Sequence, residues 1–212
     1  KVKIENNFED LIARQIIPKK FQKEEIYLIN NRIDLVNPFL NNDDFIKATE
    51  LLNNTINNKK KICIIGDYDV DGCVSASLIV KLLKYLNASY FYYIPNRFVD
   101  GYGSSLNLIK KLTIKKPDLV IMVDNGSSSN EAIEYLNKSK IKSIVIDHHE
   151  IYNPYPKADI LINPKKKSTY SKYNYFSSGV LTYFFIDLFL KKKQIKLNFS
   201  KNLYLVLLSI VT

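Results

Sequence analysis

The chain has 212 residues, 46% of them hydrophobic, which is enough for one sizeable core with a small appended lobe. No apolar run approaches the roughly 20 residues that a membrane span needs, and no apolar leader is recognisable, so we expect a cytoplasmic protein without a membrane partner. The formal charge of +10 favours an anionic partner such as nucleic acid, but all except three of the 31 basic residues are lysines, so charge alone does not decide this.

The first 58 residues are predicted to form a helical lobe. Apolar residues recur at helical spacing in three stretches: Phe8–Arg14, Phe21–Ile29 and Asp43–Ile56. Asn42 or Asp43 is a suitable cap for the third stretch. We expect this lobe, residues 1–58, to contribute packing rather than chemistry.

From Lys61 onward, short apolar runs alternate with helical stretches. The predicted strands are Ile62–Ile65, Ser89–Ile94, Leu119–Val123, Ser143–Ile146 and Ile160–Ile162. The predicted helices are Cys73–Leu86, Asn130–Lys138, Ser177–Leu190 and Phe199–Val211. Strands that are unbroken apolar runs, alternating with helices, predict an α/β domain over residues 59–212, in which helices cover both faces of a parallel sheet.

Acidic clusters follow three of the predicted strands. They span Asp67–Gly72, Asp124–Gly126 and Asp147–Glu150, and the last contains the only two histidines, His148 and His149. In an open parallel sheet, ligands bind beyond the carboxyl ends of the strands, where the loops converge. We therefore expect all three clusters to face one crevice.

Several carboxylates in one crevice repel one another unless cations neutralise them. The cysteines, Cys63 and Cys73, have neither CxxC spacing nor a second pair, so a zinc site and a disulfide scaffold are both disfavoured. Carboxylates with imidazoles suit Mn²⁺ or Mg²⁺, and two such ions about 3.5–4 Å apart would clamp a phosphodiester. Each cluster alone is explained by turns or helix caps. Together, at successive strand ends, they predict a dinuclear metal site.

The ordered motifs Gly66–Gly72, Val123–Gly126 and Asp147–His149 resemble the first three motifs of the DHH phosphoesterase superfamily. The segment Pro95–Gly103 is similar to one particular to the RecJ branch, and so are Ile162–Pro164 and the helix entry Ser178–Val180. The resemblance runs from about Asn7 to Thr212, and it implies a DHH domain of the RecJ type.

The resemblance also implies roles for individual residues. Metal ligation falls to Asp69, Asp71, Asp124 and His148, with Asp67 in or just outside the ligand shell, and His149 lies close to the scissile phosphate. Asp147 is expected to orient a neighbouring loop or imidazole. Asn96 and Arg97 are expected to hold a substrate phosphate. The alternative for Arg97 is a surface pair with Asp100.

The implied activity is 5′-to-3′ hydrolysis of single-stranded DNA in repair and recombination, by water activated between two Mn²⁺ or Mg²⁺ ions. A helicase and a single-strand-binding protein are candidate partners. The alternatives are a DHH phosphodiesterase acting on short oligonucleotides or cyclic dinucleotides, and a catalytically inactive scaffold of a replication or repair complex. We expect a further metal-binding Asp just after Thr212, and we find neither a DHHA1-type nor an oligonucleotide-binding domain, so we expect this chain alone to bind metal poorly.

Overall fold

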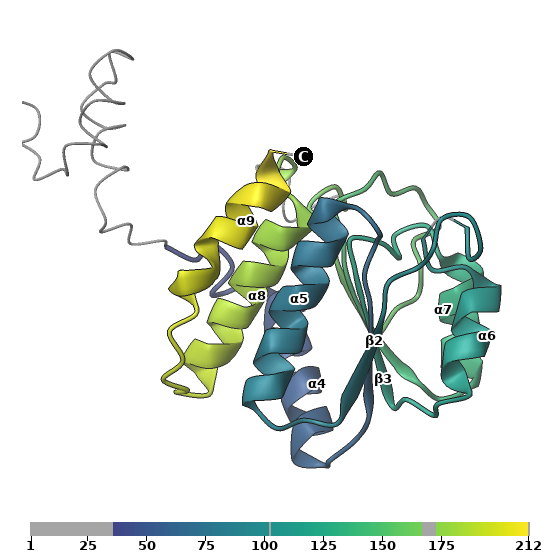
Figure 1. Ribbon diagram of the computed structural model, residues 1–212, viewed down its shortest axis with the longest axis horizontal. Coiled ribbons are helices and arrows are strands. Elements are labelled where there is room, and N and C mark those ends of the chain that lie inside the picture. Colours follow the sequence, from purple (N-terminus) through teal and green to yellow (C-terminus); the bar gives the residue numbers. More distant parts are fainter. Residues whose placement is uncertain (1–35, 102, 167–172, 212) are drawn as a thin grey trace, which may run out of the picture. The chain divides into compact units, whose positions relative to one another are not determined.

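Figure 1 shows the computed structural model of the chain, which describes residues 36–101, 103–166 and 173–211. The chain divides into two compact units, Lys1–Val36 and Asn37–Thr212, and every helix and strand given below lies in the second. The predicted helices Phe8–Arg14 and Phe21–Ile29 lie outside the described residues.

A five-stranded parallel sheet forms the centre of this unit, in the order β2-β1-β3-β4-β5. The strands are β1 (Ile62–Ile65), β2 (Tyr90–Tyr93), β3 (Leu119–Val123), β4 (Lys142–Ile146) and β5 (Ile160–Ile162). Every residue of β1 and β3 is buried, because these central strands are covered on both faces. Ile65 of β1 pairs with Met122 of β3, so the two strands end at the same edge. The predicted parallel sheet is confirmed.

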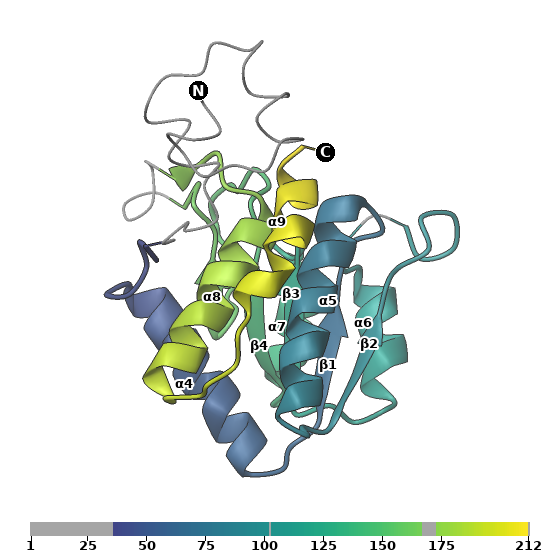
Figure 2. The ribbon, with the colours of Figure 1, turned by 60° about the vertical axis from the view of Figure 1, so that its left-hand side comes forward.

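Helices cover both faces of the sheet (Figure 1). One layer holds α4 (Asp43–Asn57), α5 (Val70–Tyr85), α8 (Ser178–Lys192), the short 3-10 turn η3 (Ser200–Asn202) and α9 (Leu203–Ile210). The other holds α6 (Leu106–Thr113) and α7 (Asn130–Lys138). Figure 2 shows α8 running beside α4 and α5, with α9 next to it. Among the described helices, none is both long and apolar enough to cross a lipid bilayer.

The helix α4 packs against α8 and β5. Its cap is Asn42, whose side-chain oxygen accepts hydrogen bonds from the backbone N–H groups of Asp44 and Phe45. The rings of Phe39 and Phe45 stack with their centroids 4.3 Å apart. The last helix of the expected N-terminal lobe therefore adds its apolar face to the core of the sheet-bearing unit, while the division at residue 58 stays a prediction.

The helix α6 was not predicted from the sequence. It begins after Ser105, whose hydroxyl accepts a hydrogen bond from the backbone N–H of Leu108, and it buries Leu108, Ile109 and Leu112 against the sheet. Leu106, Ile109 and Leu112 recur at helical spacing, so this short helix does carry a helical period, over only two turns.

Candidate metal centre

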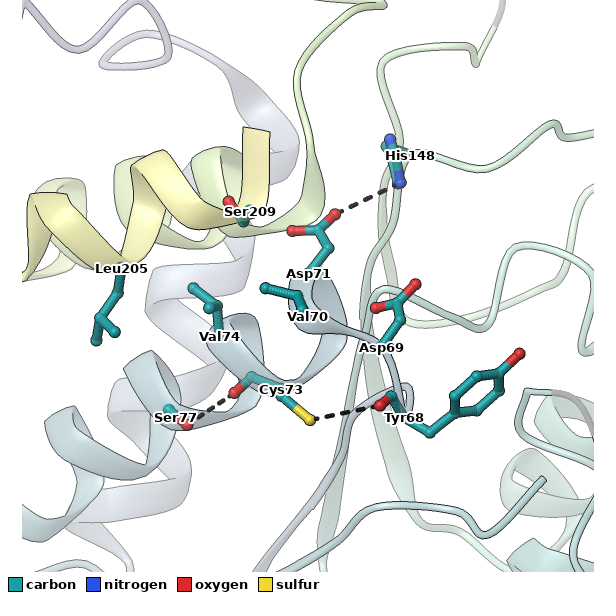
Figure 3. Close-up of a pocket in the computed structure, with 10 residues that line it drawn as sticks. All are labelled: Tyr68, Asp69, Val70, Asp71, Cys73, Val74, Ser77, His148, Leu205 and Ser209. Carbon is teal, nitrogen blue, oxygen red and sulfur yellow. Dashed lines mark hydrogen bonds and ion pairs between the residues drawn. The ribbon is translucent and has the colours of Figure 1, made fainter. Parts of the chain in front are cut away.

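The three acidic clusters follow β1, β3 and β4, which are neighbours in the sheet. Their loops therefore meet at one edge, as the sequence predicted. A cleft of about 680 Å³ opens there between the start of α5 and the helix α9. Figure 3 shows Asp71 pointing toward the ring of His148, with Asp69 below the two and Ser209 of α9 on the side of Asp71 away from His148.

Asp124 is a fully buried acid with unsatisfied oxygens. It is 0% exposed, and neither carboxylate oxygen has a hydrogen-bond partner among the described residues. Burial raises the pKa of Asp124 to about 7. Its backbone φ of 61° lies in the left-handed region, which Asp and Asn tolerate better than most residues. Because a buried charge without hydrogen bonds is costly, a bound cation would supply the coordination that these two oxygens lack.

Imidazole nitrogens lie next to this carboxylate. His148 Nε2 is 3.4 Å from Asp124 Oδ1 and 3.5 Å from Asp71 Oδ2. Asp124, His148 and His149 each offer a ligand atom within 4.8 Å of the others. The contact with Asp124 raises the pKa of His148. Carboxylate oxygens with imidazole nitrogens, and no thiolate, form a donor set that fits Mn²⁺ or Mg²⁺.

Asp71 joins the first cluster to the start of α8. Its Oδ2 accepts a hydrogen bond from the backbone N–H of Ser178 at 2.8 Å, and its Oδ1 accepts one from Gly179 at 2.7 Å. Burial raises the pKa of Asp71, although these two hydrogen bonds work in the opposite direction. A Cβ atom on Gly179 would lie 2.3 Å from Ser209 Oγ, so only glycine fits between Asp71 and α9.

The other two carboxylates of the first cluster have backbone partners. Asp69 is exposed and caps α5, because its Oδ1 accepts a hydrogen bond from the N–H of Gly72 at 2.8 Å. Asp67 is buried, and its Oδ1 accepts one from the N–H of Tyr68 at 2.7 Å. A Cβ atom on Gly72 would lie 2.4 Å from the backbone nitrogen of Asp67, so the first turn of α5 lies directly against the end of β1.

Asp147 organises the loop that carries the histidines. Its Oδ1 lies 2.8 Å from His149 Nδ1 and accepts hydrogen bonds from the N–H groups of His148 and His149, and its Oδ2 accepts one from Ser127. Burial opposes the ionisation of Asp147, but these hydrogen bonds outweigh it and hold the pKa at about 2. The same contact raises the pKa of His149 to about 9. This geometry agrees with an orienting role for Asp147.

Two buried asparagines that we did not single out as site residues connect the loops. The amide of Asn125 donates to the carbonyls of Val123 and Ile65, which ties the ends of β3 and β1 together. The amide of Asn163 donates to Ser127 Oγ and to the carbonyl of His149. Asn163 directly follows β5, and Asn125 comes two residues after Val123, the last residue of β3; these positions at strand ends are the signal that identifies them.

Arg97 is exposed and contacts one residue of the cleft lining. Its guanidinium carbon is 5.6 Å from the ring centroid of Tyr68, which lines the cleft. Among the described contacts, Asp100 pairs with Lys111 and Tyr93 rather than with Arg97, so the alternative of a surface pair is not observed. The side-chain oxygen of Asn96 accepts a hydrogen bond from the N–H of Phe98 and so shapes this loop.

Comparison with known proteins gives three kinds of match. The family described as the DHH family, N-terminal domain, matches residues 61–210. The single-stranded-DNA-specific exonuclease RecJ of Escherichia coli is 38% identical over 119 residues, which cover 56% of this chain and 21% of that protein. RecJ of Bacillus subtilis is 28% identical over 159 residues, which cover 74% of this chain and 20% of that protein.

Among solved structures, a manganese-bound exonuclease RecJ superimposes with a TM-score of 0.69 at 22% identity, covering 77% of this chain and 41% of the other. This likeness confirms the fold. The chain spans about a fifth of the length of the curated relatives it matches.

Proposed function

The chain belongs to the DHH family, and we propose that the protein containing it is a metal-dependent exonuclease that degrades single-stranded DNA from the 5′ end. The similarity to RecJ exonucleases supports this proposal, and so does the donor set at the sheet edge. The observation that carries it is the fully buried carboxylate of Asp124, which accepts no hydrogen bond among the described residues and lies 3.4 Å from His148 Nε2. When bound, two Mn²⁺ or Mg²⁺ ions supply an activated water and positive charge for the phosphate.

Four acids and one imidazole would hold these ions, namely Asp67, Asp69, Asp71, Asp124 and His148. Asp124 and His148 lie closest together and would share an ion, with Asp71 beside them. The backbone N–H groups at the start of α8 fix the carboxylate of Asp71, so its position does not depend on the ion. Preorganised ligands lose little freedom when the ion binds.

His149 and Arg97 act on the substrate in this proposal. His149 is held by Asp147, which keeps its imidazole oriented and favours its protonated form. A protonated His149 next to the scissile phosphate stabilises negative charge that develops on the phosphate oxygens. Arg97, and Asn96 beside it, would hold a phosphate further along the strand. Asp147 is a positioning residue, since it acts through His149.

The proposal includes a cytoplasmic location, and a helicase and a single-strand-binding protein as partners. It stands against two alternatives. A phosphodiesterase for short oligonucleotides or cyclic dinucleotides would share the metal centre, but the similar relatives are named as exonucleases specific for single-stranded DNA. An inactive scaffold would not need a buried carboxylate without hydrogen bonds at Asp124.

A cleavage assay with a matched control tests the proposal. Full-length protein and its Asp124→Asn and Asp118→Asn variants are incubated with Mn²⁺ and single strands labelled at the 5′ or 3′ end. Asp118 lies directly before β3, whereas Asp124 lies directly after it. Unlike Asp124, Asp118 is exposed, and its carboxylate accepts a hydrogen bond from the backbone N–H of Lys61. We expect 5′-mononucleotides from the wild type and the control, and none from Asp124→Asn.

Digestion from the 3′ end would contradict the proposed polarity. Equal rates for Asp124→Asn and the wild type would contradict the metal centre itself. Faster cleavage of dinucleotides than of long strands would favour the phosphodiesterase.

A further inference from the structure

An aromatic ring on the loop after β2 is almost entirely in solvent. Phe98 is 96% exposed, and its neighbour Val99 is 77% exposed. Apolar side chains of this size gain free energy by leaving water, and folding has not removed these two. Their exposure leaves these two side chains available for contact with a molecule outside this chain.

The loop holds this ring outward with a dense set of hydrogen bonds. The carbonyl of Asn96 accepts hydrogen bonds from the N–H groups of Val99 and Asp100, at 3.1 and 2.8 Å. Asp100 Oδ2 accepts one from the N–H of Asn96 at 3.0 Å and another from the hydroxyl of Tyr93 at 2.7 Å. The loop is thus closed on itself and tied to the sheet, so Phe98 is presented from a fixed base.

Asp100 is the residue on which this arrangement depends. Its side chain is only 7% exposed, and Lys111 Nζ of α6 lies 3.5 Å from its Oδ1. One carboxylate therefore connects the loop, the edge strand β2 and α6. The hydrogen bond from the N–H of Asn96 is the main cause that lowers the pKa of Asp100.

The neighbours of Phe98 identify the kind of ligand. Arg97 lies over the ring of Tyr68, and Tyr68 lines the cleft that contains Asp71 and His148. Phe98 directly follows Arg97 in the sequence, so one loop carries both the guanidinium that lies over Tyr68 and an exposed aromatic ring. Alternating cationic and aromatic groups bind single-stranded nucleic acid, because the cations hold phosphates while the rings stack on bases.

We propose that Phe98 is a stacking platform for a nucleobase of the single-stranded substrate and that Asp100 is the positioning residue that holds this platform and Arg97 in place. This inference rests on the proposed function and adds a base contact outside the metal centre. Stacking on a ring does not distinguish one base from another, so the contact favours an unpaired strand without selecting its sequence.

Binding to two kinds of strand tests the proposal. Full-length protein is titrated, in EDTA to prevent cleavage, into a labelled single strand and into a strand of equal length made of abasic residues. Phe98→Ala should weaken binding of the normal strand about tenfold and leave the abasic strand unchanged, because only the former offers bases. Phe98→Tyr keeps a ring and should bind as the wild type does. Val99→Ala is the matched control, since it trims the adjacent exposed apolar side chain.

The positioning role of Asp100 has its own readout. Asp100→Ala should weaken binding of both strands, because it releases Arg97 together with Phe98. Asp100→Asn should restore most of the affinity, because its amide oxygen can take the place of Oδ2. Mn²⁺ affinity, measured by calorimetry, should be the same in all these variants, whereas a general loss of structure would lower it.

Equal binding by Phe98→Ala and the wild type overturns the inference, and so does an equal loss for both strands. Either result leaves the exonuclease proposal intact, and the first would direct attention to a protein partner for this ring. Conversely, the wild type could bind the normal strand more tightly than the abasic strand and yet cleave neither strand with Mn²⁺. That result would support the base contact and contradict the proposed activity.

Discussion

Replacing Asp124 with Asn removes one buried charge and keeps the size of the side chain. Burial raises the pKa of Asp124 from its ordinary value near 3.8 to about 7. The folded protein therefore binds this proton more tightly than the unfolded chain does, and stability falls as the pH rises from about 4 to 7. At about 1.4 kcal/mol per pKa unit, the ionised carboxylate costs the metal-free protein roughly 4 kcal/mol above pH 7.

The variant has no such pH-dependent cost. Asn also tolerates the left-handed backbone at this position, where φ is 61°. Its buried amide lacks partners, which costs roughly 1–3 kcal/mol at every pH. From pH 5 to pH 8, we therefore expect the free energy of unfolding of Asp124→Asn to improve relative to the wild type by about 2–3 kcal/mol.

Urea unfolding in EDTA, followed by far-ultraviolet circular dichroism at pH 5 and pH 8, measures this difference. Added Mn²⁺ should then stabilise the wild type and not the variant, because an ion that binds only the folded state adds to its stability. If Asp124→Asn lost the same stability at both pH values, the claim that the ionised Asp124 destabilises the metal-free protein would be wrong.

Three further substitutions test the supporting contacts of the site. Asp71→Ala leaves two buried N–H groups at the start of α8 without an acceptor and should lower the free energy of unfolding by roughly 2–4 kcal/mol in urea titrations. Gly72→Ala places a Cβ atom 2.4 Å from the backbone nitrogen of Asp67 and should lower the melting temperature by many degrees. Asp147→Asn removes the main cause of the raised pKa of His149, so this pKa should fall from about 9, as measured by nuclear magnetic resonance titration.

Each of these substitutions has a control of the same kind elsewhere in the chain. For Asp71→Ala the control is Asp43→Ala, which removes an exposed acid from the first turn of α4. For Gly72→Ala it is Ser77→Ala, which changes an exposed position of α5. For Asp147→Asn it is Glu150→Gln, which removes an exposed charge next to His149. We expect small effects from all three. A loss of stability in a control equal to that of its partner would show that the contact in question is not responsible.

The strands and the place of the site could be predicted from the sequence because both depend on local pattern. Leu119–Val123 is an unbroken apolar run with an acid directly after it, and the structure has β3 with those bounds. The helix α6 could not be predicted in the same way, because its eight residues follow a loop and show only two helical turns.

The partners of the carboxylates could not be predicted, because they come from distant parts of the chain. Asp71 is 107 and 108 residues from the backbone groups that bind it. From the sequence, Asp69, Asp71 and Asp124 are equivalent acids at strand ends. Only the fold shows that Asp69 caps a helix and that Asp71 anchors one, while Asp124 has neither role.

This difference identifies the residue on which the metal centre depends most. Asp69, Asp71 and Asp147 each accept hydrogen bonds from backbone N–H groups, so part of the cost of burying or crowding their charge is offset by the protein. Asp124 accepts no backbone hydrogen bond among the described residues and has His148 Nε2 at 3.4 Å and His149 Nδ1 at 3.8 Å beside it, yet it is the least exposed of the four. A buried carboxylate destabilises the metal-free fold when it is ionised, and a bound cation offsets this cost. The cation is therefore expected to bind first at Asp124 and His148, with the more exposed Asp69 contributing to a second, weaker position.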